Sequence, residues 1–259
     1  MNILQLRKVS KDFGGIQAMQ NVDLEVDQAR LTALIGPNGS GKTTLFNVVT
    51  GITRATSGNI LFNGLDIGQD PPYRITMKGI ARTFQNIRLF NEMSVLENVM
   101  AGQHCRTHAG LVSSMLRLKS ATGEQRKAVA DATELLEFVG LKEHAFNLAV
   151  NLPYGRKRLV EIARALASEP RLLLLDEPAA GMNESETERL KILIREIHGQ
   201  KQISVVLVEH DMKLVMGIAD WIIVLDHGQK IAEGTAGEIQ ENPRVIEAYL
   251  GQETRYAAG

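Results

Sequence analysis

The chain has 259 residues, of which 44% are hydrophobic and 23% are charged, and its formal net charge at pH 7 is -1. This composition is typical of a globular protein that needs no disulfide or structural metal to hold its core. The balanced charge argues against a nucleic-acid partner, which normally requires a basic excess. One cysteine, Cys105, excludes an internal disulfide framework and fits a reducing compartment. The sequence contains no run of the roughly 18 apolar residues that a membrane span needs. We therefore expect a cytoplasmic protein that meets a membrane only through partners.

The N-terminal part of the chain predicts an antiparallel β layer. The segments ILQLRKVSKDF (3–13) and VDLEVDQ (22–28) alternate between apolar and polar residues, as half-exposed strands do. The segment SGNILFNGLDI (57–67) has turn glycines around a short apolar run.

Continuous apolar runs predict a second sheet whose strands are buried on both faces. These runs are LTALIG (31–36), RLLLLDEP (171–178), SVVLVEH (204–210) and WIIVLDHG (221–228). Helical patterns alternate with them, over 41–51 and over 186–199, where the apolar residues 190, 193, 194 and 197 share one helix face. This alternation predicts an α/β fold with a doubly wound parallel sheet.

The middle of the chain, from about residue 86 to 163, is expected to be mostly helical. An amphipathic helix is predicted over 131–141, with Gly140 as its stop signal. The stretch THAGLVSSMLRLKSATGEQ (107–125) is expected to be a loop around a short helix.

A phosphate-binding loop is indicated by GPNGSGKT, Gly36 to Thr43, which lies between a predicted buried strand and a helix. Gly39 and Gly41 allow the backbone amides to surround phosphate oxygens, next to the positive end of the helix dipole. Lys42 is expected to bridge the β- and γ-phosphates, and Thr43 to present its hydroxyl to Mg²⁺. A plain glycine turn before a helix is the alternative interpretation. The pattern indicates that the protein binds a nucleoside triphosphate. It does not indicate which process the triphosphate drives.

Acidic residues follow the predicted strand LLLLDEP at the sheet edge where open α/β sheets place their ligands. Asp176 is expected to hold Mg²⁺ through water, and Glu177 to polarise the attacking water. The alternative is that the two acids only cap a helix. His210 ends a neighbouring predicted strand and is expected near the γ-phosphate, although a lone histidine there is more often structural. The other histidines are expected to be surface or packing residues: His104, His108, His144, His198 and His227.

The order of these motifs, with a YG pair before a helix some twenty residues upstream of LLLLDEP, resembles the ATP-binding subunit of ABC transporters along nearly the whole chain. The resemblance implies ATP and Mg²⁺ as cofactors and a P-loop (RecA-like) core with an N-terminal β layer and an inserted helical subdomain. It implies one domain over 1–259, with the core formed by 1–86 and 164–259 and the helical and signature subdomain by 87–163.

The resemblance also assigns roles to residues. Gly36 to Thr44 resemble the Walker A loop, Phe13 the aromatic that stacks on adenine, and Gln85 the glutamine that senses Mg²⁺ beside the groove for the membrane subunit. Asn183 ends the D-loop, at a position where aspartate is commoner. The residues implied to contact nucleotide are Phe13, Gly36, Asn38, Gly39, Ser40, Gly41, Lys42, Thr43, Thr44, Gln85, Pro153, Tyr154, Gly155, Arg156 and Asn183. Those implied to hold Mg²⁺ are Thr43, Gln85 and Asp176, and those implied in catalysis are Lys42, Glu177 and His210.

Longer stretches are similar to the larger of the two ATPase subunits in importers of branched-chain amino acids. They are residues 84–104, 176–183 and 208–251, which end in NPRVIEAYLG. Related ATPases that serve urea, amides or lipopolysaccharide share much of this pattern, and cargo is read by the membrane subunits and an external binding protein.

The resemblance implies a peripheral protein at the cytoplasmic face of the membrane. Its expected partners are a second ATPase subunit, distinct or identical, and two permease subunits; the binding protein is an indirect partner. Two ATPase subunits face head to tail, and each ATP lies between the Walker A loop of one and the signature loop of the other.

The signature loop departs from the family pattern L-S-G-G-Q, because NLPYGR (151–156) has Pro153 and Arg156 in place of serine and glutamine. Proline removes a hydroxyl that would touch the γ-phosphate, while the backbone amide of Gly155 stays available. Proline suits the first turn of a helix, so we expect the helix start to survive. Arg156 adds a positive charge near the nucleotide. Two ATP sites form between the two subunits, and the one that this loop completes is expected to be weaker than the other.

Two other classes of ATP-binding protein fit the sequence less well. A soluble ABC ATPase of translation or DNA repair usually has two cassettes or a long coiled coil, whereas this chain has one Walker A, one Walker B and no sustained heptads. A regulatory module that binds ATP without hydrolysing it is supported only by the altered signature loop, and Lys42, Asp176, Glu177 and His210 argue against it.

Overall fold

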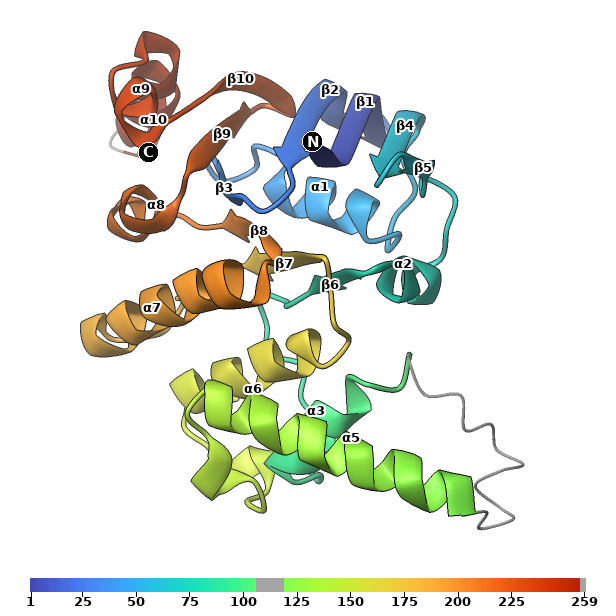
Figure 1. Ribbon diagram of the computed structural model, residues 1–259. Helices are drawn as coiled ribbons and strands as arrows, with labels where there is room; N and C mark the ends of the chain where they lie inside the picture. The colour runs from blue at the N-terminus through green and yellow to red at the C-terminus, as the bar shows by residue number, and fades with distance from the viewer. Residues whose placement is uncertain (106–118, 257–259) are drawn as a thin grey trace.

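A six-stranded sheet forms the centre of the computed structural model, which describes residues 1–105 and 119–256 (Figure 1). Its strand order is β10-β9-β3-β8-β7-β6. All neighbouring strands are parallel except β10, which is antiparallel to β9. The strands are β3 (Leu31–Ile35), β6 (Ile80–Arg82), β7 (Leu172–Asp176), β8 (Ser204–Val208), β9 (Trp221–Asp226) and β10 (Gln229–Gly234). Every residue of β3, β7 and β8 is buried, which confirms the prediction made from the apolar runs.

The predicted antiparallel layer is also confirmed. It has the order β2-β1-β4-β5 and consists of β1 (Asn2–Phe13), β2 (Ile16–Asp27), β4 (Ser57–Phe62) and β5 (Leu65–Asp66). Helix α1 (Lys42–Val49) lies between this layer and the central sheet (Figure 1). Its buried side chains Leu45, Phe46 and Val49 join strands of both sheets in one hydrophobic cluster. The helix that begins at the phosphate loop is therefore fixed from both sides.

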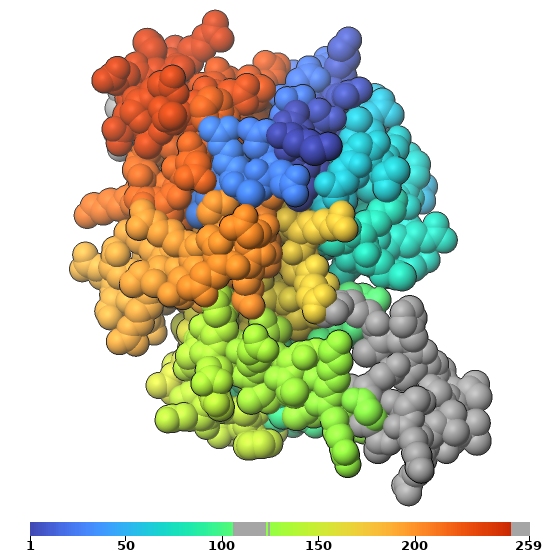
Figure 2. Space-filling view, viewed as in Figure 1, coloured from blue at the N-terminus to red at the C-terminus, as the bar shows by residue number. Residues whose placement is uncertain are grey.

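The middle of the chain is helical, as expected. It contains α3 (Val95–Ala101), α5 (Lys119–Phe138), two short 3-10 turns η1 (Lys142–His144) and η2 (Ala149–Asn151), and α6 (Tyr154–Leu166). The helix predicted over 131–141 starts earlier, at Lys119, and ends before Gly140, whose φ of 73° is unsuited to continuing it. Of the loop expected over 107–125, residues 107–118 lie outside the described residues, and the rest belongs to α5. Figure 2 shows α5 at the opposite end of the molecule from the C-terminal helices.

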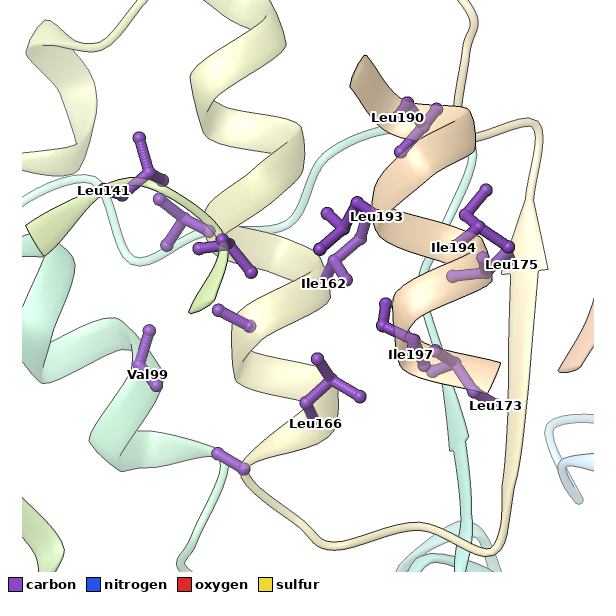
Figure 3. Packing of buried hydrophobic residues seen from close by; sticks show 14 of the residues in the cluster. Val99, Leu141, Ile162, Leu166, Leu173, Leu175, Leu190, Leu193, Ile194 and Ile197 are labelled. Atoms are coloured by element: carbon purple, nitrogen blue, oxygen red, sulfur yellow. The ribbon is translucent and has the colours of Figure 1, made fainter. Parts of the chain in front are cut away.

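The remaining helices cover the central sheet and its edge. They are α2 (Pro72–Lys78), α7 (Glu184–Lys201), α8 (Met212–Ile218), α9 (Ala236–Gln240) and α10 (Pro243–Tyr256). The predicted face of α7 is buried, and Figure 3 shows its side chains Leu193 and Ile197 between α6 and β7. Within the described ranges, no helix combines the length and apolar character needed to cross a bilayer.

A pair of isoleucines on α7 tests this packing. Ile194 is fully buried in the cluster between α7, α6 and β7, whereas Ile192 is 59% exposed on the same helix. We expect Ile194→Ala to lower the free energy of unfolding by about 2–5 kcal/mol, because it removes buried methyl groups and leaves a cavity. The control Ile192→Ala should change it by about 0.5 kcal/mol or less. Urea denaturation of both variants measures the difference, and equal effects would contradict the assigned helix face.

Candidate active site

The predicted site residues follow three strands that lie side by side in the order β3-β8-β7. Because these strands are parallel, their carboxyl ends meet at one edge of the sheet. The phosphate loop follows β3, Asp176 and Glu177 lie at the end of β7, and His210 follows β8. The topology therefore brings residues that are far apart in sequence to one place.

The phosphate loop requires glycine at both of its bends. Gly36 has a φ of 146°, and a Cβ there would lie 2.0 Å from the Leu225 carbonyl oxygen. Gly41 has a φ of 105°, and a Cβ there would lie 2.8 Å from the Ala18 carbonyl oxygen. Any side chain would push the loop away from β2 and β9. The contact with Ala18 also places the hairpin of β1 and β2 beside the loop.

The ammonium group of Lys42 lies inside the curve of the loop. It donates hydrogen bonds to the carbonyl oxygens of Gly36 and Pro37, at 2.8 and 2.9 Å. Burial lowers the pKa of Lys42 below its ordinary value, and the nearby carboxylates of Glu177 and Asp176 act in the opposite direction. A buried cation thus lies within the loop, as expected for a group that binds an anionic phosphate.

The start of α1 fits a phosphate bound with Mg²⁺. Thr43 is exposed in the first turn of α1, which has no acidic residue to compete for its free backbone amides. The Thr43 hydroxyl, the Asp176 carboxylate and the Gln85 side-chain amide offer the oxygen ligands that Mg²⁺ prefers. Ser40 is buried beside Lys42, whereas Asn38 and Gly39 are exposed and Thr44 is half-buried.

Glu177 is held in an unusual backbone conformation at the end of β7. Its φ is 46°, a region that non-glycine residues seldom adopt, and its backbone amide donates to the Val208 carbonyl of β8 at 2.9 Å. The Gln85 side chain donates to the Glu177 carboxylate at 2.8 Å, and His210 Nδ1 lies 3.9 Å from the same carboxylate oxygen. Two of the predicted residues therefore converge on the carboxylate of a third.

Asp176 is buried and paired with Arg82, a residue that the sequence analysis did not assign. Arg82 Nη2 donates to Asp176 Oδ2 at 2.7 Å, and Nη1 donates to Asn47 of α1 at 2.7 Å. The guanidinium also lies between the rings of Phe46 and Phe84. The sequence signal for Arg82 is only its place three residues before Gln85, at the end of the short strand β6.

Glu209 is a second functional candidate that the sequence analysis missed. It is buried, and its carboxylate accepts hydrogen bonds from the backbone amides of Ala179, at 2.8 Å, and His210, at 3.2 Å. Burial raises the pKa of Glu209, and the amide donors act in the opposite direction. Glu209 therefore links the segment after Glu177 to the backbone that presents His210.

Phe13, which is expected to contact adenine, and Asn183, which is expected in the D-loop, each make contacts of their own. Phe13 is 45% exposed at the end of β1, and Lys11 Nζ lies 4.7 Å from the centre of its ring. Asn183 is the N-cap of α7. Its side-chain oxygen accepts a hydrogen bond from the Glu186 backbone amide, and its own backbone amide donates to the Glu186 carboxylate. This capping box gives Asn183 a structural role in addition to the expected one.

The segment NLPYGR forms the start of α6, and the expected helix start is confirmed. Pro153 is the N-cap residue, α6 begins at Tyr154, and Arg156 is exposed in the first turn. A Cβ on Gly155 would lie 2.6 Å from a Glu186 carboxylate oxygen, and the Tyr154 ring packs against Gly181. The segment therefore lies against the start of α7 in the same chain.

The C-terminal helix reaches the phosphate loop. Tyr249 of α10 packs against a hydrophobic cluster that includes Ile35, the last residue of β3. Burial raises the pKa of the Tyr249 hydroxyl, and the backbone of Gly36, which interacts with it, acts in the opposite direction. The beginning of the loop is thus supported by residues from the end of the chain.

Comparison with known proteins identifies the family. The family model described as ABC transporter matches residues 19–180, and the one described as branched-chain amino acid ATP-binding cassette transporter matches residues 229–254. The chain is 43% identical to BraF of Pseudomonas aeruginosa and 45% identical to LivG of Escherichia coli K12, both named as high-affinity branched-chain amino acid transport ATP-binding proteins. Both similarities cover 96% of this chain and 98% of the relative.

Solved structures agree. A nucleotide-free ATP-binding cassette from an ABC transporter superimposes with a TM-score of 0.84 at 34% identity, covering 96% of this chain and 99% of that structure. A cassette in its ADP conformation gives a TM-score of 0.83 at 33% identity, covering 97% and 99%. The chain therefore belongs to the ABC transporter family, has the ABC ATPase fold, and is an ATP-binding subunit of the kind that BraF and LivG represent.

Proposed function

We propose that the chain binds and hydrolyses ATP to energise the import of branched-chain amino acids. The observation that carries the proposal is the convergence of Gln85 and His210 on Glu177 beside a phosphate loop that encloses Lys42, at the edge where parallel strands end. The names of BraF and LivG support this cargo. Cargo such as urea, amides or lipopolysaccharide, the alternative that the sequence left open, is not favoured by these names or by the match of residues 229–254.

The residues divide the work of phosphoryl transfer. The loop amides and Lys42 bind the phosphates. The oxygen atoms of the Thr43, Gln85 and Asp176 side chains would hold Mg²⁺, which would supply positive charge to the triphosphate. Glu177 orients and polarises the attacking water, and its tether to Val208 keeps the carboxylate in position. His210, whose side chain is 67% exposed, lies 3.9 Å from that carboxylate and would contact the γ-phosphate of a bound nucleotide.

The active assembly requires a second ATPase subunit. The segment 152–156 leads into the first turn of α6, where Tyr154 and Arg156 are exposed, and it lies against α7 of the same chain. We propose that it completes the site of a partner, a related or identical subunit, and that the partner completes this one. Phe13 stacks on adenine and Asn183 faces the partner's site in this arrangement.

A groove between the core and the helical region is the proposed docking site for a permease. Its volume is about 1020 Å³, and its lining includes Phe84, next to Gln85. Three of its large apolar side chains are mostly exposed, namely Tyr73, Met77 and Phe90. Exposed apolar side chains gathered in one groove mark an interface, here with a cytoplasmic segment of the membrane subunit. The protein is then peripheral, at the cytoplasmic face of the membrane, and an external binding protein delivers the cargo.

Two substitutions test the hydrolytic role in the assembled transporter. Lys42→Ala should abolish ATP binding, because it removes the cation inside the loop. Glu177→Gln should retain ATP but lower turnover by about 10²- to 10⁴-fold, because the general base is lost. Filter binding and phosphate release measure the two effects, with Lys142→Ala, an exposed ion-pair lysine, as the control. Normal hydrolysis by the Gln variant would remove Glu177 from its role.

His210→Ala should lower turnover by about 10²-fold or more while leaving ATP affinity nearly unchanged, because the imidazole lies beside the reacting groups and not in the phosphate loop. The matched control is His227→Ala, since His227 is an exposed histidine that directly follows another strand of the same sheet. Steady-state phosphate release separates the two variants. An unchanged rate for His210→Ala would make that histidine structural.

Pro153→Ser should raise ATP turnover and strengthen ATP-driven association with the partner ATPase, because it restores a hydroxyl at the start of α6. Serine is also a favourable N-cap, so the helix start is preserved. Asn151→Ser, at a neighbouring exposed position, is the control. Sedimentation in the presence of ATP measures the association, and phosphate release measures the ATPase rate. If neither changes, Pro153 does not weaken the ATP site that this loop completes.

A further inference from the structure

Residues 84–85, here called the Gln85 segment, are bonded to a different part of the molecule from the residues just before them. Thr83 belongs to the sheet, since its amide donates to the Leu174 carbonyl and its hydroxyl accepts from the Asp176 amide. Arg82 is anchored there as well, through Asp176. The backbone groups of Phe84 and Gln85, by contrast, bond to side chains of α6.

Two charged residues of α6 make these bonds. Arg158 donates to the carbonyl oxygens of Phe84, at 2.5 Å, and Gln85, at 2.7 Å. Glu161 accepts from the Phe84 amide at 3.3 Å and pairs with Arg158 at 2.6 Å. The same guanidinium donates to the Tyr154 hydroxyl at 3.2 Å. One ion pair therefore joins the Gln85 segment to the first residue of α6.

The burial of this pair calls for an explanation beyond stability. The side chains of Arg158 and Glu161 are 0% and 1% exposed. Removing two charges from water costs several kcal/mol per ion, and apolar residues of similar size often stabilise a protein as well or better. A planar guanidinium can, however, hold two neighbouring carbonyl groups at fixed positions, which an apolar side chain cannot do.

We propose that Arg158 and Glu161 are positioning residues that fix the backbone of Gln85 to α6, so that a displacement of Gln85 carries the start of α6 with it. The hinge then lies between Thr83 and Phe84. The proposal rests on the proposed role of Gln85 at the nucleotide, and it names the residues through which a displacement of Gln85 would reach the segment 152–156.

The test measures the displacement of the helical region directly in the chain of residues 1–259. Spin labels at Glu143→Cys, in the helical region, and Glu241→Cys, in the core, are introduced with Cys105→Ser and Glu177→Gln, so that ATP is retained. Pulsed electron paramagnetic resonance records the distance between the labels with and without ATP and Mg²⁺. We expect the distance to change on nucleotide binding.

The double variant Arg158→Met/Glu161→Leu removes the pair without leaving a buried charge unpaired. It should bind ATP within about threefold of the parent protein, because Lys42 and its loop are untouched, yet lose at least half of the distance change. Glu137→Leu/Lys142→Met, which removes an exposed ion pair in the same helical region, should keep the full change.

A full distance change in the Arg158 and Glu161 double variant, or no change in the parent protein despite bound ATP, would overturn the proposal. Failure of the parent to bind ATP would instead contradict the proposed function. Should the double variant not fold, Arg158→Lys replaces it: one ammonium cannot hold both carbonyls in the fork geometry, so the change should shrink, and an undiminished change again overturns the proposal.

Discussion

The hydrogen bond between the Glu177 amide and the Val208 carbonyl is the constraint on which the site depends. It extends the pairing of β7 and β8 by one residue and holds Glu177 at a φ that costs about 1–3 kcal/mol for a residue with a side chain. That conformation turns the carboxylate toward Gln85 and His210 instead of continuing the strand. The strain is sustained because both strands are buried at every position, so neither can yield.

Buried charged side chains around this carboxylate bond to groups on different elements. Arg82 joins β6 to Asp176 on β7 and to α1, and Glu209 joins the end of β8 to the backbone after Glu177. In a medium that screens poorly, each charge fixes the position of its partner more firmly than an exposed pair could. The sheet edge thus behaves as one network, with Lys42 as the cation that faces it.

Sequence patterns predicted most of this fold, because buried strands and the phosphate loop leave local signals. The apolar runs that lead to Gly36 and Asp176 predicted strands β3 and β7, and the spacing of the glycines predicted the phosphate loop. Strand β6, by contrast, is three residues long and has no periodicity to detect. Arg82, Arg158 and Glu209 were missed because their roles arise only from tertiary contacts: each is an ordinary charged residue in sequence and is buried only when distant elements pack around it. The length of α5 was missed because its first turns lack an apolar face.

The support of the phosphate loop by α10 has an evolutionary consequence. Residues 229–254, which match the branched-chain group of cassettes, end in the helix whose Tyr249 packs against the cluster that contains Ile35 and interacts with the Gly36 backbone. A segment that distinguishes one group of transporters is therefore in physical contact with the loop that all of them share. Changes at Tyr249 and in the strand that leads into the loop alter one packed interface, so they should covary among relatives and be inherited together when cassettes are recombined.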